Sequence, residues 1–313
     1  MSASDSMTTQ ARAPLSRAAG ARSAPPWLDR LAYPFTPRTM HLTDGTVSYV
    51  DEGRGEAILF VHGTPTWSFE YRHLIRALSA THRCIALDHL GFGLSDRPAE
   101  FSYSPEAHAR VLAEFVDRVG VDRFTLVAHD YGGPIALPLA LASPGRVRAL
   151  AILNSWMWSF DDDPELRRKA RLAGGALGRL LYRRLNFPLR TLMPYAYGDK
   201  QKLTPEIQRQ YLAPFPDADA RERALWALAR ALLGSSAHFD SLWRRRASLT
   251  DMPALIVWGM RDRALPPSLL ARWREALPQA QVVELASVGH WPHEEAPTEV
   301  LAHLNAFLGA TPC

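Results

Sequence analysis

The chain of 313 residues is 47% hydrophobic and 22% charged, and its formal net charge is only +4. This composition is ordinary for a globular protein with a large core, and no compact run of Lys and Arg with interleaved aromatic residues indicates a nucleic-acid partner. The two cysteines, Cys84 in an apolar run and Cys313 at the last position, do not describe a disulfide framework.

The N-terminal residues 1–26 are rich in Ala, Ser, Thr, Pro and Arg. They lack the apolar stretch of about 7 to 15 residues that a secretory signal needs, so we expect a disordered tail. The sequence also lacks an apolar run of about 18 residues that could cross a membrane. We therefore expect a cytoplasmic protein without stable membrane association.

Strands and helices alternate from residue 27 to residue 155. The alternation of apolar and polar residues around Asp44-Gly45 predicts a hairpin. Short, wholly apolar runs are typical of parallel strands that are buried on both faces. The expected parallel strands are 57–61, 84–87, 124–128 and 149–153, and the helices between them are 68–80, 104–119 and a third that ends near 142. This alternation predicts a doubly wound α/β sheet, with residues 27–155 as the first part of its core.

Strand-like runs disappear between residues 156 and 249. Three helices are expected there, over 164–185, 204–212 and 218–233, and we interpret this segment as a helical lid inserted into the core. Alternation then resumes with strands at 254–258 and 281–284 and helices at 267–277 and 298–308. Residues 250–313 are thus expected to form the second part of the core.

The strongest chemical signal is Ala128-His129-Asp130-Tyr131-Gly132-Gly133, where a strand passes through a sharp turn into a helix. This is the setting of a nucleophile elbow, in which small residues flank the nucleophile. The backbone N–H of Tyr131, at the start of the helix, can then stabilise developing negative charge. As an alternative, Asp130 caps the helix, because Asp is a common N-cap residue.

Two further residues follow predicted strands. Asp262 lies in Gly259-Met260-Arg261-Asp262 and His290 in Gly289-His290-Trp291. Open α/β sheets build their sites at the carboxyl ends of strands, and the order nucleophile, acid, histidine matches the triad order of this kind of fold. Asp130, Asp262 and His290 are therefore the expected catalytic residues. His129 is expected to be structural, and His293 to cap a helix or lie on the surface.

A carboxylate nucleophile implies a particular reaction. Asp130 is ionised at neutral pH, so it can displace a leaving group from saturated carbon and form an alkyl-enzyme ester. His290 then activates water to hydrolyse the ester, while Asp262 orients the imidazole. This chemistry requires no metal or organic cofactor, and we expect none; the expected partners are a small apolar organic substrate and water.

The motifs, taken together, resemble those of the haloalkane dehalogenases. The similar segments are His62 to Ser68, Asp88 to Pro98, His129 to Gly133, Gly259 to Asp262 and Gly289-His290, and the resemblance extends from about Trp27 to Leu308. It implies an α/β-hydrolase fold with an inserted lid. It also implies Asp130, His290 and Asp262 as the triad, with the backbone N–H groups of Thr64 and Tyr131 as the pair that binds the developing anion or halide.

The chain departs from this family at two positions. Dehalogenases usually place Trp after the nucleophile and Asn or Glu at the position of Thr64, whereas this chain has Tyr131 and Thr64. Hydrolysis of a carbon–halogen bond is the leading expectation, and an epoxide hydrolase, a lactone-acting relative and a non-catalytic binding protein remain as alternatives. An epoxide hydrolase needs lid tyrosines, and the candidates are Tyr182, Tyr195, Tyr197 and Tyr211. Trp156 and Trp158 are expected to line the substrate pocket, with core packing as the alternative for both.

Overall fold

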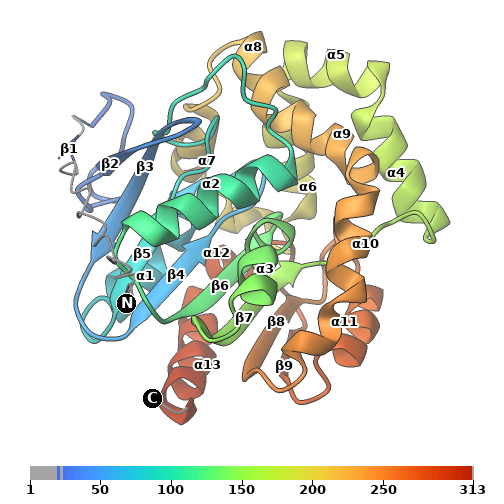
Figure 1. Cartoon of the computed structure of the whole chain (residues 1–313). Coiled ribbons are helices and arrows are strands. Elements are labelled where there is room, and N and C mark those ends of the chain that lie inside the picture. Colours follow the sequence, from blue (N-terminus) through green and yellow to red (C-terminus); the bar gives the residue numbers. More distant parts are fainter. Residues whose placement is uncertain (1–19, 22–23, 312–313) are drawn as a thin grey trace, which may run out of the picture.

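The computed structural model describes residues 20–21 and 24–311 (Figure 1). Within the tail expected over residues 1–26, the described residues are Gly20–Ala21, which form strand β1, and residues 24–26. The rest of that prediction lies outside the described residues. No helix in the described ranges is long and apolar enough to cross a membrane.

The described strands form one nine-stranded sheet in the order β1-β2-β3-β5-β4-β6-β7-β8-β9. Neighbouring strands are antiparallel from β1 to β5 and parallel from β5 to β9. The predicted hairpin around Asp44-Gly45 joins β2 to β3. The strands after β1 are β2 (Arg38–Leu42), β3 (Gly45–Glu52), β4 (Ala57–Val61), β5 (Arg83–Leu87), β6 (Phe124–Asp130), β7 (Val147–Ser155), β8 (Ala254–Gly259) and β9 (Gln281–Leu285).

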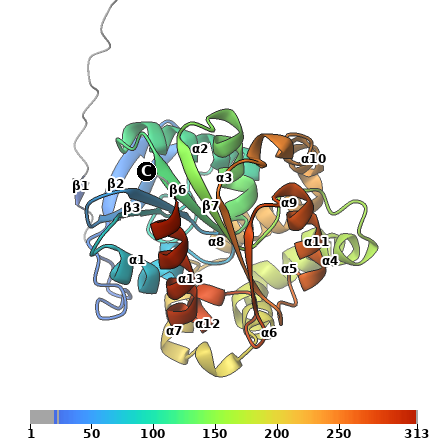
Figure 2. The same cartoon turned by 90° about the horizontal axis from the view of Figure 1, so that it is seen from below.

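Helices cover both faces of the sheet, as a doubly wound fold requires. On one face α1 (Arg72–Leu78) contacts α13 (Pro297–Ala310), and on the other α2 (Pro105–Arg118) contacts α3 (Gly132–Ala142) (Figure 2). Two further helices of the core are α11 (Leu270–Ala276) and α12 (Pro292–Glu295). The α/β-hydrolase prediction is confirmed by this architecture.

The lid consists of the helices between β7 and β8. They are α4 (Pro164–Gly174), α5 (Ala176–Leu185), α6 (Met193–Ala196), α7 (Pro205–Leu212), α8 (Ala218–Ala220), α9 (Ala227–Gly234) and α10 (Ser236–Arg244). Short 3-10 or π turns occupy Ser68–Tyr71, Pro188–Leu192, Lys200–Lys202, Arg221–Trp226, Arg246–Leu249 and Pro267–Leu269.

The single helix predicted over 164–185 is wrong, because the chain breaks between α4 and α5. Gly175 is extended, with ψ of −178°. A Cβ on Gly174 would lie 2.9 Å from the Cα of Arg230, so α4 crosses α9 at a distance that only glycine permits. The break lets α4 pack against α9 while α5 turns to pack against the segment that precedes α9.

Two sides of the lid are held differently. On one side, a buried ion pair between Arg72 and Glu294 of the core also binds the hydroxyl of Tyr211 in α7. On the other side, α4 and α5 form the outer edge of the molecule (Figure 1) and expose leucine side chains there. These exposed leucines are Leu172, Leu177, Leu180 and Leu185.

Candidate active site

Asp130 lies at the point where β6 turns into α3. Its backbone is left-handed, with φ of +47°, which is rare for a residue other than glycine and typical of a strained functional turn. A Cβ on Gly132 would lie 2.0 Å from the carbonyl oxygen of Val61, so α3 starts directly against β4. The small residues predicted beside the elbow are therefore required by the close approach of these two elements.

The carboxylate of Asp130 does not cap α3. The helix is preceded by Tyr131, and no side chain caps its N-terminus. Instead, Asp130 Oδ2 accepts a hydrogen bond of 2.9 Å from the backbone N–H of Thr64. The capping alternative is thus wrong, and one of the two predicted backbone donors lies at the carboxylate.

His290 bridges the two carboxylates. Its Nδ1 lies 2.7 Å from Asp262 Oδ2, and its Nε2 lies 3.5 Å from Asp130 Oδ1. All three side chains are buried. Burial by itself would lower the pKa of His290, but the carboxylates of Asp262 and Asp130 raise it to about 10. The structure therefore brings the three predicted residues together around one imidazole.

Asp262 is held by donors on both of its oxygens. Its Oδ1 accepts from the backbone N–H groups of Ala264 and Leu265, at 2.7 and 2.9 Å. Its Oδ2 accepts from the side-chain amide of Asn154 at 2.7 Å, and Asn154 in turn accepts from the N–H of Gly259. Asn154 was not predicted as a site residue; the available signal was a polar side chain near the end of a buried apolar strand.

The hydroxyl of Tyr131 points away from the nucleophile. It donates a 2.6 Å hydrogen bond to the carbonyl oxygen of Leu228 in α9, and the ring is buried against Trp156. The hydroxyl proton is thus donated to the backbone of the lid and is not directed at a ligand beside Asp130. The Thr64 side chain forms no hydrogen bond with the described residues, so the backbone N–H is its established contact to Asp130.

A cavity of about 560 Å³ opens above the nucleophile. Asp130, His290, Thr64 and Tyr131 lie in its wall, and the remaining lining residues are mostly apolar side chains of the lid. Such a cavity is suited to an apolar organic molecule oriented by a few polar groups.

The two predicted pocket tryptophans lie in different places. Trp156 lines the cavity beside Tyr131, as expected. Trp158 does not line it; its ring lies 5.5 Å from both Trp243 and Trp273, where it fills the space between α10 and α11. The pocket prediction for Trp158 is therefore wrong, and its packing alternative is correct.

The four candidate tyrosines also separate. Tyr182 and Tyr195 line the cavity, although Tyr195 is half exposed. Tyr197 stacks on Trp291, and the hydroxyl of Tyr211 is bound to Glu294, so neither lines the cavity. Burial, and then the nearby charge of Asp130, raises the pKa of Tyr182.

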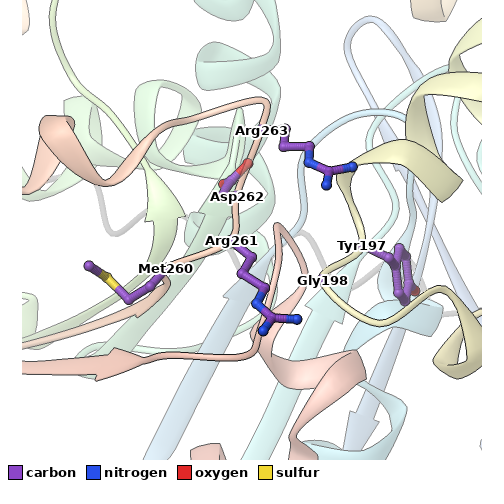
Figure 3. A pocket seen from close by; sticks show the side chains of 6 residues that line it. All are labelled: Tyr197, Gly198, Met260, Arg261, Asp262 and Arg263. Carbon is purple, nitrogen blue, oxygen red and sulfur yellow. The ribbon is translucent and has the colours of Figure 1, made fainter.

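A second hollow of about 430 Å³ lies beyond Asp262 and is lined by Tyr197, Gly198 and residues 260–263 (Figure 3). The side chains of Arg261 and Arg263 both project toward its Tyr197 side. Neither Asp130 nor His290 lines it. The larger cavity is therefore the candidate active site.

Behind the elbow lies a buried group that the sequence did not predict. Ligand-type atoms of Glu70, His129 and His293 lie within 4.8 Å of one another. The expectation that His293 caps a helix or lies on the surface is wrong, because its ring is completely buried and stacked on Tyr71.

The sequence and the fold are similar to those of known hydrolases. Residues 56–297 match the model of the alpha/beta hydrolase fold family. Haloalkane dehalogenase 2 of Mycobacterium tuberculosis is 37% identical over 90% of this chain and 98% of its own length. A cis-3-alkyl-4-alkyloxetan-2-one decarboxylase of Shewanella oneidensis is 34% identical over 89% of this chain and 90% of its own length. The crystal structure of the haloalkane dehalogenase DatA from Agrobacterium tumefaciens C58 is similar with a TM-score of 0.79 and 28% identity, over 88% of this chain and 97% of that one.

Proposed function

The chain belongs to the α/β-hydrolase family and, within it, to the haloalkane dehalogenases and their near relatives, and we propose that it hydrolyses a carbon–halogen bond of a small apolar substrate with Asp130 as nucleophile. The observation that carries this proposal is the position of His290, between Asp262 at 2.7 Å and Asp130 at 3.5 Å. A carboxylate that is already ionised and faces an apolar cavity can attack carbon without a base.

The reaction proceeds in two steps. An oxygen of Asp130 displaces the halide and forms an ester with the alkyl group. Water then attacks the ester carbonyl, His290 accepts its proton, and the backbone N–H of Thr64 stabilises the oxyanion that develops on Asp130. When the intermediate collapses, the leaving alkoxide takes the proton from His290 and departs as the alcohol, and the Asp130 carboxyl group loses its proton to solvent, which restores the carboxylate. Asp262 keeps the imidazole oriented throughout.

The two carboxylates influence the stage of the reaction at which His290 can accept a proton. In the free enzyme, Asp262 and Asp130 both favour the charged imidazole. Ester formation converts Asp130 into a neutral group, so one of the two causes of the raised pKa disappears. The pKa of His290 therefore falls once the nucleophile has reacted, which favours the neutral imidazole that can accept a proton from water.

A second candidate function is the opening of a strained lactone. The specific observation is the hydrogen bond from Tyr131 to Leu228, which leaves the side chain after the nucleophile without a donor for a free halide. Opening a lactone ring leaves a carboxylate attached to the substrate, so no free anion has to be held beside Tyr131. The similar protein from Shewanella oneidensis is named for a reaction of an alkyl-substituted oxetanone, a four-membered lactone.

A His290→Phe variant tests both candidates. It should form the ester but hydrolyse it slowly, so incubation with 1-bromohexane, a cis-dialkyl oxetanone or styrene oxide should give a mass adduct from the true substrate class. Peptide mapping should place the adduct on Asp130, and Asp130→Ala is the control that cannot form it. The absence of any adduct with all three classes would contradict a covalent carboxylate mechanism.

The assignments of Asp130, His290 and Asp262 as triad, and of the Thr64 and Tyr131 backbone as anion donors, are part of this proposal. So is the use of water and a small apolar substrate as the only partners. A cytoplasmic location stays a prediction, which fractionation of the native host would test.

A further inference from the structure

Among the buried ionisable groups that have no role in the proposed reaction, three lie together behind the elbow. Glu70, His129 and His293 are completely buried, and Glu70 Oε2 lies 3.3 Å from His129 Nδ1 and 3.6 Å from His293 Nε2. Neither oxygen of Glu70 has a well-aligned hydrogen-bond donor among the described residues. A buried carboxylate without compensation is strongly destabilising, so this cluster must contain a positive charge or a shared proton.

Hydrogen bonding locates that proton on His129. Its Nε2 lies 2.8 Å from the carbonyl oxygen of His290, and a carbonyl only accepts, so Nε2 carries a hydrogen. Its Nδ1 faces Glu70 Oε2. An unprotonated Nδ1 would place its lone pair against a lone pair of that carboxylate oxygen, which is repulsive. The short distance to the Glu70 carboxylate therefore favours a His129 ring that carries hydrogen on both nitrogens, with Nδ1–H in charge contact with Glu70 and not in an aligned hydrogen bond.

The electrostatics of the neighbours agree with this assignment. Burial acts to raise the pKa of Glu70, but His129 and then His293 hold it well below its usual value, so the carboxylate is charged. Burial lowers the pKa of His293, which favours the neutral form of that ring. Of the two rings beside Glu70, His129 is the nearer, at 3.3 Å, and it is the one whose Nε2 faces a carbonyl acceptor.

The bond from His129 reaches the backbone of the proposed base. His129 directly precedes Asp130 in β6. Among the described residues, its Nε2–H is the donor to the His290 carbonyl oxygen. The His290 N–H is bound on the other side, to the carbonyl of Ala196. The loop that carries the imidazole is thus connected to the strand that carries the nucleophile.

We propose that Glu70 and His129 form a charged positioning pair. Glu70 keeps His129 doubly protonated, and the Nε2–H of His129 holds the His290 backbone in place. The imidazole of His290 then faces the ester on Asp130. This inference rests on the proposed function. Attack by Asp130 needs only the carboxylate, whereas hydrolysis of the ester needs His290 at a set distance. Loss of the pair should therefore slow ester hydrolysis and leave ester formation nearly unchanged.

Two double variants that differ by one methylene test the pair. Both replace the charges by amides: Glu70→Gln with His129→Gln, and Glu70→Gln with His129→Asn. Glutamine can place its N–H where His129 Nε2 lies and keep the bond to the His290 carbonyl, and asparagine is too short to do so. Removing both charges together avoids leaving a single buried charge. A Glu70→Leu, His129→Leu variant provides an apolar replacement if an amide variant does not fold.

The readout is the split between kcat and KM with the substrate that forms the adduct. The glutamine variant should retain kcat within about threefold, and the asparagine and leucine variants should lose about tenfold in kcat, the effect of one hydrogen bond. Because ester hydrolysis alone is slowed, KM should fall with kcat, kcat/KM should stay constant, and the alkyl-enzyme should accumulate in intact-mass spectra.

Equal kcat in the glutamine and asparagine variants would overturn the positioning role, and so would an equal loss of kcat/KM in both. Absence of an adduct in the His290→Phe variant with every substrate class would refute the proposed function instead. In that case, ¹⁵N NMR of the histidine side chains still tests the pair, because a singly protonated His129 in the wild type contradicts it. One equivalent of bound metal that disappears in the glutamine variant would also overturn it.

Discussion

Removing the Tyr131 hydroxyl tests whether this group belongs to the lid or to the reaction. In the structure it donates to the Leu228 carbonyl at 2.6 Å, and the ring is 2% exposed. A hydrogen bond between neutral groups contributes about 1 kcal/mol net to the free energy of unfolding. Leu228 lies inside α9, so its carbonyl keeps its helical partner when the hydroxyl is lost. We therefore expect Tyr131→Phe to lower the free energy of unfolding by about 1 kcal/mol.

The effect of the same change on turnover distinguishes two arrangements. A donor that stabilises a developing anion in a buried site contributes about 3 to 4 kcal/mol, or 10²–10³ in rate. Because the hydroxyl points to the lid, we expect kcat/KM for bromide release from a bromoalkane to change by less than about threefold. Urea unfolding measures the first effect and bromide release the second.

Tyr182→Phe is the matched control for this experiment. Tyr182 lines the cavity, and its hydroxyl has no hydrogen-bond partner among the described residues, so the free energy of unfolding should hardly change. A loss of about 100-fold in kcat/KM for Tyr131→Phe, with unchanged stability, would refute our placement of the hydroxyl.

Three further outcomes are expected. The pKa of His290 is raised in the folded state to about 10, so its contribution to stability is complete below about pH 6.5 and is lost as pH rises through 10; urea unfolding between pH 7 and 10 should show this loss, and His290→Gln should reduce it. Asn154→Ala removes the amide donor to Asp262 and the acceptor for the Gly259 N–H, and we expect a loss of about 1–3 kcal/mol in unfolding free energy and slower ester hydrolysis in single-turnover experiments. Gly132→Ala places a Cβ 2.0 Å from the Val61 carbonyl, so we expect little folded protein by circular dichroism, whereas Gly145→Ala, where a Cβ meets no atom within 4 Å, should fold normally.

The sequence predicted the fold and the residues that meet around His290, because both depend on local signals. A strand, a turn of small residues and a helix are visible in residues 124–142, and the carboxyl ends of parallel strands meet at one edge of the sheet whatever their exact order. Asp262 and His290 therefore come together without any knowledge of the lid.

The features that were wrong or missed depend on contacts between distant segments. The break at Gly175 follows from the crossing of α4 and α9, and the position of Trp158 follows from two tryptophans that come 85 and 115 residues later. Asn154 reaches Asp262 only because β7 and β8 are neighbours in the sheet. Likewise, the direction of the Tyr131 hydroxyl is set by α9, and the burial of His293 by Tyr71 and Glu70.

The unequal attachment of the lid implies an order of opening. The α7 side is tied through Tyr211 to the buried Arg72–Glu294 pair of the core, whereas surface ion pairs such as Arg179–Glu222 join α5 to another segment of the lid. Exposed ion pairs contribute little, so the α4–α5 side should separate first. We therefore expect the lid to open by rotation about α7, which stays attached to the core. The edge that moves away carries Leu172 and Leu177, and both of these residues line the cavity. Admission of substrate, and with it the selection among chain lengths and branching, would then be decided by the free edge and not by the residues that carry out the reaction.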